Sequence, residues 1–209
     1  MTKKELLKDT DFYFITDSKL TKKTVLDDVK AAIAGGVKIV QYREKEKSKQ
    51  EMIEEASRIK ELCGNDVILT INDDVDVALA VNADGVHLGS DDVPYDAARE
   101  KLGNDKIIGV TCRNAEDAAK AEKLGADYVS IGPIFSTTTK PGLKPVGIEM
   151  IEKVKNVINI PFVAIGGINL DNLDSVTEAG AARVAAISAV VAKDDVEREV
   201  KRFIGGIRK

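Results

Sequence analysis

Short apolar runs rich in β-branched residues alternate with longer amphipathic segments along the whole chain. Eight such runs predict strands at 12–16, 37–43, 67–72, 84–88, 106–112, 127–134, 161–166 and 183–190. The segments that follow them place apolar residues three and four positions apart, which predicts helices at 26–34, 49–62, 75–81, 96–102, 115–124, 148–157, 170–179 and 194–204. Asn114, Asn169 and Asp194 stand where three of these helices should begin, as candidate N-caps.

This alternation also predicts the fold class. Hydrophobic strands that are each followed by a helix favour a parallel sheet whose outer face is covered, and eight βα units are the number found in a closed (β/α)₈ TIM barrel. We therefore expect a single TIM-barrel domain over residues 1–209. An open, doubly wound sheet is the alternative fold. Two small domains are disfavoured because no Gly/Ser-rich or Pro-rich linker divides the chain.

Composition narrows the class of protein. The formal net charge is -4 and the pI is near 5.3, which argues against a nucleic-acid groove, because such a groove needs a net basic surface. Cys63 and Cys112 lie far apart and form no CxxC pair, so neither a disulfide framework nor a zinc site is indicated. No segment approaches the roughly 20 apolar residues of a membrane span, and the N-terminus lacks the apolar core of a signal peptide. We expect a cytoplasmic protein whose partners are small molecules.

Polar residues cluster where the predicted strands end. Gln41, Arg43 and Lys45 share one face at strand period two, and the loop 135–142 carries three hydroxyls and an ammonium directly after an apolar run. In a barrel, active sites form at the carboxyl ends of the strands, so these side chains should converge on a phosphorylated ligand. The alternative for residues 41–45 is a solvated charged loop, because further glutamates and lysines follow them directly.

Carboxylates at two neighbouring strand ends indicate a divalent cation. Asp73 ends the third strand, and Asp91 and Asp92 follow the fourth, so Asp73 and one of this pair could share Mg²⁺. The competing interpretation is helix capping, since Asp74 and Asp92 both precede predicted helices. We assign Asp74 to that capping role.

The seventh and eighth units predict a second anion site. Gly166 and Gly167 offer bare backbone N–H groups after the seventh strand, and Ile187 and Ser188 stand at the end of the eighth. The only histidine, His87, is expected to be a packed or hydrogen-bonded residue rather than a general base. Two anion sites without a base between them favour a reaction in which pyrophosphate leaves and a neutral nucleophile attacks.

Four motifs, taken together, resemble the thiamine phosphate synthase family over nearly the whole chain. They are Q-x-R-x-K at 41–45, I-N-D at 71–73, G-x-H-x-G-x-x-D at 85–92 and T-x-T-K at 137–140. The resemblance implies a TIM-barrel transferase that couples 4-amino-2-methyl-5-hydroxymethylpyrimidine diphosphate to a thiazole ethyl phosphate. The implied mechanism is dissociative, with loss of pyrophosphate before the thiazole nitrogen attacks.

The same resemblance implies a role for each matching residue. Asp73 and Asp92 would hold Mg²⁺, and Lys140, Arg43 and Thr111 would be catalytic. The pyrimidine diphosphate would be bound by Gln41, Arg43, Lys45, Asn72, Thr111 and Lys140. The thiazole phosphate would be bound by Thr137, Thr139, Gly167, Ile187 and Ser188.

The chain departs from the family pattern at four positions. Thr111 stands where the family usually has serine and Arg113 where a histidine is usual, while Asp74 replaces a common arginine and Ser90 a common glutamine. None of these changes removes a named ligand. A thiazole tautomerase and a non-catalytic binder of thiamine phosphate precursors are the alternatives. The oligomeric state and the choice between carboxylated and decarboxylated thiazole are left open.

Overall fold

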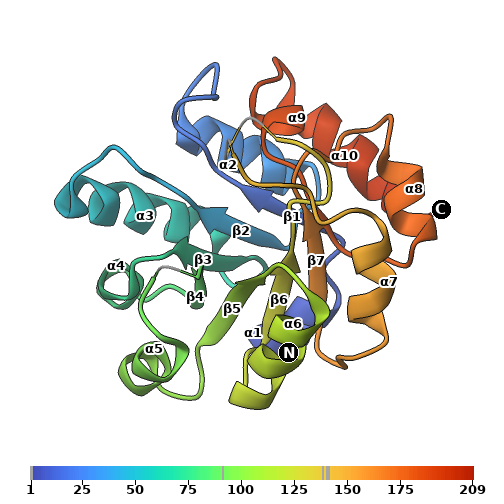
Figure 1. The fold of residues 1–209 in the computed structure, drawn as a ribbon. Coiled ribbons are helices and arrows are strands. Elements are labelled where there is room, and N and C mark those ends of the chain that lie inside the picture. Colours follow the sequence, from blue (N-terminus) through green and yellow to red (C-terminus); the bar gives the residue numbers. More distant parts are fainter. Residues whose placement is uncertain (1, 91, 138, 140–141) are drawn as a thin grey trace.

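A closed barrel of eight parallel strands forms the centre of the protein, in a computed structural model that describes residues 2–90, 92–137, 139 and 142–209. The strands pair in chain order, and the last returns to pair with the first (Figure 1). They are β1 (Phe12–Ile15), β2 (Ile39–Tyr42), β3 (Ile68–Asn72), β4 (Gly85–Leu88), β5 (Ile107–Cys112), β6 (Tyr128–Ile131), β7 (Phe162–Ile165) and β8 (Val184–Ala185). The predicted TIM barrel is confirmed, and the open sheet is excluded.

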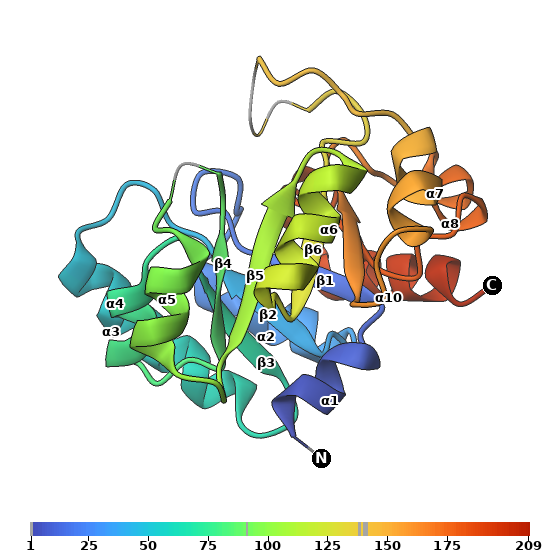
Figure 2. The ribbon, with the colours of Figure 1, turned by 60° about the horizontal axis from the view of Figure 1, so that its bottom comes forward.

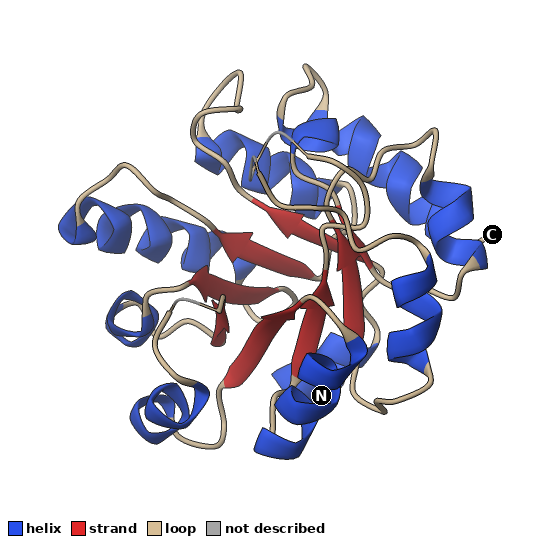
Figure 3. Ribbon diagram, viewed as in Figure 1, coloured by secondary structure: helices blue, strands red, loops and turns tan. Residues whose placement is uncertain are grey.

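Helices surround the barrel on its outer side (Figure 3). They are α2 (Val25–Ala34), α3 (Lys49–Cys63), α4 (Val75–Ala80), α5 (Tyr95–Leu102), α6 (Ala115–Leu124), α7 (Glu149–Lys155), α8 (Leu173–Glu178), α9 (Ser188–Val191) and α10 (Val196–Ile207), preceded by α1 (Lys3–Lys8). Within the described residues, no helix is long and apolar enough to cross a membrane.

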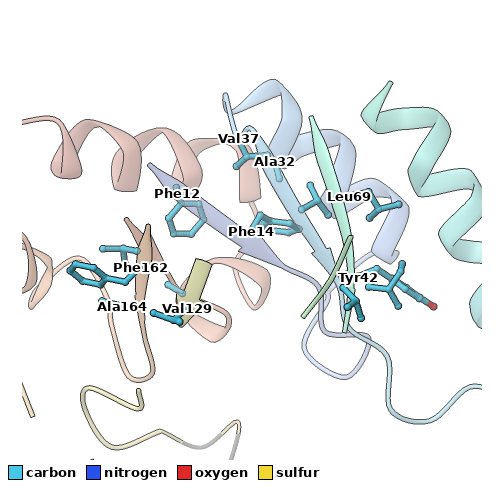
Figure 4. Close-up of a cluster of buried hydrophobic side chains, with 14 of the residues drawn as sticks. Phe12, Phe14, Ala32, Val37, Tyr42, Leu69, Val129, Phe162 and Ala164 are labelled. Atoms are coloured by element: carbon cyan, nitrogen blue, oxygen red, sulfur yellow. The ribbon is translucent and has the colours of Figure 1, made fainter. Parts of the chain in front are cut away.

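Each strand sends alternate side chains to two separate cores, as the period of two requires. Phe12 and Phe14 of β1 face outward and join Leu69 and Phe162 in the layer between strands and helices (Figure 4). Tyr13 and Ile15 face the barrel interior instead. The interior cluster contains Tyr13, Ile15, Ile39, Ile68, Ile107, Tyr128, Val163 and Ala185. The protein therefore has an apolar outer layer and a smaller inner core directly below the mouth of the barrel.

The sequence analysis missed α1, which covers the amino-terminal end of the barrel (Figure 2). Leu6 and Leu7 of this helix pack into the interior cluster. A capping box starts the helix: the Thr2 hydroxyl accepts from the Glu5 backbone N–H, and the Glu5 carboxylate accepts from the Thr2 N–H. That signature, Thr-x-x-Glu, is readable in the sequence.

The eighth unit differs most from its prediction. A strand over 183–190 was expected, but β8 spans only Val184–Ala185 and a helical turn follows it. The chain leaves the extended conformation at Ile187 (φ -95°, ψ -76°), and the Val191 N–H donates to the Ile187 carbonyl at 2.8 Å. Ile187 and Ser188 therefore stand at a helix start rather than a strand end.

The candidate N-caps were partly right. Asn114 caps α6, because its side chain accepts from the Asp117 N–H. The prediction for Asp194 was wrong by one residue, since Asp195 caps α10. Asn169 lies before the start of α8, where its side chain accepts from the N–H groups of Asp171 and Asn172 in a turn. At α6 and α10, a short polar side chain satisfies a backbone donor that the helix leaves unpaired.

Candidate active site

A single pocket of about 530 Å³ opens at the carboxyl ends of the strands. Its walls contain every predicted site residue that the structure describes: Gln41, Arg43, Lys45, Asn72, Asp73, Asp92, Thr111, Thr137, Thr139, Gly167, Ile187 and Ser188. Lys140 and Asp91 lie outside the described residues. Side chains that are up to 147 positions apart in the sequence (188 minus 41) are thus brought to one cavity by the parallel strands.

The end of β2 carries an amide and two cations, as the alternating pattern indicated. Gln41 is buried, and Arg43 is held by an ion pair in which Nη1 lies 2.8 Å from Asp17 Oδ2. Neither group belongs to a solvated loop. The buried Glu44 carboxylate accepts from the backbone N–H groups of Lys45 and Glu46, at 2.7 and 2.8 Å. Burial acts to raise the pKa of Glu44, but these hydrogen bonds outweigh it and leave the pKa lowered. Glu44 thus fixes the turn that presents both cations.

The two predicted metal ligands contact each other. Burial raises the pKa of the Asp92 carboxyl above its usual range, and a hydrogen bond with Asp73 raises it further. Asp92 Oδ2 also accepts from the Gly89 N–H at 2.7 Å, and Lys45 Nζ lies 2.5 Å from Asp73 Oδ2. Two carboxylates in contact form a donor set that a cation would stabilise, and Mg²⁺ often takes only one or two protein carboxylates. The described residues contain no cluster of three or more metal-ligating side chains.

Asp74 has a different role from this pair, because it caps a helix. The Asp74 side chain accepts from the Val77 N–H at 2.9 Å, which confirms the capping role assigned to it. Asp92 does not cap a helix, because α5 begins after Pro94 and its cap makes no side-chain hydrogen bond. Asp73 has a backbone φ of 65°, a left-handed conformation that non-glycine residues seldom adopt outside turns and functional sites.

Thr111 lies at the end of β5, beside a hydrogen-bonded histidine. His87 Nε2 is 2.9 Å from Thr111 Oγ1, and His87 Nδ1 is 2.8 Å from the Tyr128 hydroxyl. The expectation of a hydrogen-bonded histidine is confirmed. Arg113, two residues further along, lines the pocket and donates from Nη2 to the Lys144 carbonyl at 2.8 Å. Its Nη1 atom is buried and has no hydrogen-bond partner. Arg113 therefore brings a positive charge to the pocket wall.

The connection between β6 and α7 rises above the carboxyl ends of the strands (Figure 2). It carries Thr137 and Thr139, and the Thr139 N–H donates to the Thr137 hydroxyl at 3.3 Å. Gly167 packs against the start of this connection with φ 67°. A Cβ on Gly167 would lie 2.7 Å from Phe135 Cβ and would also collide with the Ser136 carbonyl. The glycine is required first by this contact within the protein.

Ser188 completes the opposite wall as the first residue of α9. The first N–H groups of a helix have no partner within the helix, so this end of the wall offers backbone donors and a hydroxyl. No side-chain cap occupies that position. The wall built by β6, β7 and β8 can therefore bind an anion without a charged side chain.

The lining residues that were not predicted include the polar side chains of Tyr13, Tyr128, Ser130, Arg113 and Asp117. Tyr13, Tyr128 and Ser130 point into the barrel from β1 and β6, within strands that read as ordinary apolar runs. A signal did exist, because polar side chains occupy alternate positions at 128 and 130 and again at 41 and 43. Identifying the inward face, however, required the strand register.

Comparison with known proteins identifies the family to which the chain belongs. A family model described as thiamine monophosphate synthase matches residues 12–190. Thiamine-phosphate synthases from Methanosarcina barkeri and Methanosarcina mazei are 54% and 55% identical over 208 residues, covering 99% of this chain and 94% and 87% of theirs. A solved thiamine phosphate pyrophosphorylase from Pyrococcus furiosus superposes with a TM-score of 0.87 at 36% identity, covering 95% of this chain and 96% of that one. The chain belongs to the thiamine monophosphate synthase family.

Proposed function

We propose that the chain joins a pyrimidine diphosphate to a thiazole ethyl phosphate, forming thiamine phosphate and releasing pyrophosphate. The two Methanosarcina relatives are named for that activity, and this chain covers 94% and 87% of their length. The observation that carries the proposal is the pocket itself, where residues from β2 to α9 meet in one cavity of about 530 Å³. This volume suits a ligand of ordinary cofactor size.

The two walls suit the two substrates differently. Arg43, Lys45 and the unpartnered Nη1 of Arg113 supply positive charge on the β2 to β5 side, which suits a diphosphate. Gly167, the start of α9 and the hydroxyls of Thr137, Thr139 and Ser188 supply neutral donors on the β6 to β8 side, which suits a phosphate monoester. The reacting carbon and the thiazole nitrogen would then meet between the walls.

Asp73 and Asp92 are the proposed ligands of Mg²⁺. The ion would supply a positive charge that stabilises the diphosphate as its bond to carbon breaks. Lys45 forms an ion pair with Asp73 and stands beside the proposed metal position, so its ammonium is placed to bind the same leaving group. Thr111 adds a neutral donor from β5. The chain's own groups thereby stabilise charge that develops on the departing pyrophosphate.

The hydrogen bonding of the pocket histidine is consistent with this reaction. The described pocket has one histidine, and both of its ring nitrogens are engaged with hydroxyl groups. A thiazole nitrogen attacks as a neutral nucleophile with a free lone pair, so no proton has to be removed from it. The residues lining the pocket bind and orient both partners, and substrate positioning supplies much of the rate.

An assay with both substrates and Mg²⁺ tests the proposal. We expect pyrophosphate and thiamine phosphate in equal amounts, detected by a coupled phosphate assay and by mass spectrometry, and neither product when one substrate is omitted. Isomerisation of a carboxylated thiazole phosphate without pyrophosphate release would identify a tautomerase instead. Tight binding of both substrates without product would identify a binding protein.

A further inference from the structure

A chain of buried hydrogen bonds crosses the barrel interior and joins the two ends of the proposed pyrimidine diphosphate site. Gln41 Nε2 donates to the Tyr13 hydroxyl at 3.2 Å, and the Tyr13 and Tyr128 hydroxyls are 2.5 Å apart. Tyr128 then contacts His87 Nδ1 at 2.8 Å, and His87 Nε2 contacts Thr111 at 2.9 Å. The chain thus connects a predicted pyrimidine contact to a predicted diphosphate contact without using solvent.

Packing fixes this chain in place. Tyr13 and Tyr128 are 2% and 1% exposed, and Tyr128 lies over Gly109 of β5, where a Cβ would collide with the phenol ring. The ring of His87 stacks on that of Tyr128, with centroids 5.5 Å apart. Burial raises the pKa of both phenols, so each is a neutral hydroxyl with one proton to donate. Because every member donates a limited number of protons, the direction of the whole chain can be worked out.

The assignment of donors and acceptors starts at Tyr13, whose oxygen accepts from Gln41. Thr70 Oγ1 lies 2.9 Å from the Tyr13 hydroxyl, where either atom can donate, and 3.4 Å from the Val40 carbonyl, which can only accept. The proposed direction places the Thr70 proton on the shorter contact, toward Tyr13. With two donors directed at its oxygen, Tyr13 then gives its own proton to Tyr128. Tyr128 then gives its proton to Nδ1 of His87, which leaves the hydrogen of the neutral imidazole on Nε2.

The assignment ends at Thr111. Its oxygen accepts from His87 Nε2–H at 2.9 Å and from the Ser130 hydroxyl at 3.3 Å. The Ser130 oxygen also lies 3.3 Å from His87 Nε2, and it can only accept there when that nitrogen carries the hydrogen. Both acceptor positions of the hydroxyl are then filled from inside the barrel, so its own proton is left for a ligand in the pocket. In the opposite direction, Thr111 would give its proton to His87 and could only accept. That arrangement would place an oxygen lone pair against the diphosphate.

We propose that His87, Tyr128 and Tyr13 are positioning residues that direct the Thr111 proton toward the diphosphate. This inference rests on the proposed function, because it assumes that a diphosphate occupies the β5 side of the pocket. In this direction every bond dipole points its positive end toward the diphosphate and its negative end toward Gln41. Breaking the carbon–oxygen bond leaves positive charge on the pyrimidine and negative charge on pyrophosphate, so the aligned chain stabilises the transition state more than the ground state.

The direction can be measured without any substrate, because His87 is the only histidine of the chain. Protein labelled with ¹⁵N-histidine should give one pair of ring-nitrogen resonances at neutral pH. We expect Nε2 in the range of a protonated nitrogen, with a directly bonded hydrogen, and Nδ1 in the range of an unprotonated one. The reverse tautomer, or a hydrogen on both nitrogens, would overturn the proposal even if the enzyme were fully active.

Kinetics test whether the direction matters. Tyr128→Phe keeps the ring over Gly109 and removes only the donor to His87, so kcat should fall about 10-fold, as expected for one lost hydrogen bond. The KM for the diphosphate should change less than kcat. Tyr42→Phe is the matched control: Tyr42 is equally buried, and its hydroxyl donates to Glu55 at 2.7 Å on the outer side of the barrel. This control should keep wild-type kcat.

A double-mutant cycle separates positioning from general support of the fold. If Tyr128 acts through the Thr111 hydroxyl, removing that hydroxyl with Thr111→Val should abolish the effect of Tyr128→Phe, so that the double variant has the kcat of Thr111→Val alone. Effects that simply multiply would contradict the proposal. An inactive wild-type protein would instead reject the proposed function, while the NMR result would still report the tautomer.

Discussion

The two walls of the pocket carry different kinds of hydrogen-bond donor. The wall from β2 to β5 is charged, with Arg43 paired to Asp17 and Lys45 paired to Asp73. The wall from β6 to α9 presents hydroxyls, Gly167 and the start of α9. In both walls the donors are arranged before any ligand arrives, but by ion pairs in one and by backbone packing in the other.

This contrast has a consequence for binding. On the charged wall, Lys45 neutralises a proposed metal ligand, so a metal and a diphosphate must together replace that ion pair. On the neutral wall, no ion pair has to break, and Gly167 is held by its contact with the connection after β6. Substitutions on the charged wall should therefore affect the chemical step and metal use, whereas those on the neutral wall should affect the affinity of one substrate.

The largest effect is expected for Asp73→Asn. Asparagine tolerates the left-handed φ of 65° found at this position, so the fold should remain while one carboxylate is lost. We expect kcat to fall by about 10³-fold, as for the loss of a strong charge-stabilising group, with a higher Mg²⁺ requirement. Steady-state kinetics over a range of Mg²⁺ concentrations measure both.

Asp76→Asn is the control for this substitution. Asp76 is an exposed carboxylate paired with Lys49 and Lys101, away from the pocket walls. It should leave kcat and the Mg²⁺ dependence unchanged. Near-normal turnover of Asp73→Asn at low Mg²⁺ would contradict the assignment of the metal to the charged wall.

Lys140 is expected to rank second, although it lies outside the described residues and its role rests on the T-x-T-K motif. If its ammonium follows the charge on the departing pyrophosphate, Lys140→Ala should lower kcat by on the order of 10²-fold. Single-turnover kinetics at saturating substrates isolate that step. A loss confined to diphosphate affinity would show that Lys140 binds the ground state only.

Arg43→Ala should weaken the pyrimidine diphosphate by roughly 10-fold or more, since a charge-assisted hydrogen bond contributes about 1.5 to 3 kcal/mol. The thiazole phosphate should bind as before. Calorimetric titration of each substrate tests this. The change also leaves the buried Asp17 without its partner at 2.8 Å, so Arg43→Ala/Asp17→Asn should be titrated beside it to remove that penalty. Equal weakening of the binding of both substrates would contradict the assignment of one substrate to each wall.

The smallest effect is expected for Ser188→Ala on the neutral wall. One hydroxyl donor is lost among several backbone donors, so thiazole phosphate affinity should fall by roughly 3- to 10-fold, with diphosphate affinity unchanged. This variant is a cleaner probe than Gly167→Ala, because a Cβ on Gly167 would collide with the protein itself before reaching any ligand. Calorimetry with the two substrates again distinguishes the walls.

The sequence predicted the barrel and most of its mouth for a clear physical reason. Period-two and period-three-to-four patterns set the elements, and parallel strands then bring their carboxyl ends together without further information. It could not predict that Ile187 leaves the strand conformation, because Val, Ala, Ile and Ser at 184–191 suit a strand and a short helix alike. Nor could it predict the inward contacts of Tyr13 and Tyr128, which depend on strand register. The left-handed backbone conformation of Asp73 could not be predicted from the residue types around it.

The amino-terminal helix α1 closes the barrel at the end opposite the pocket. Leu6 and Leu7 rest on the inner cluster, and the buried isoleucines of β2, β3 and β5 form the layer above them. Two substrates must therefore enter, and two products must leave, through the same opening at the carboxyl ends. Binding of the second substrate therefore has to follow or accompany the first at that one opening, and the order of binding becomes a property of the fold.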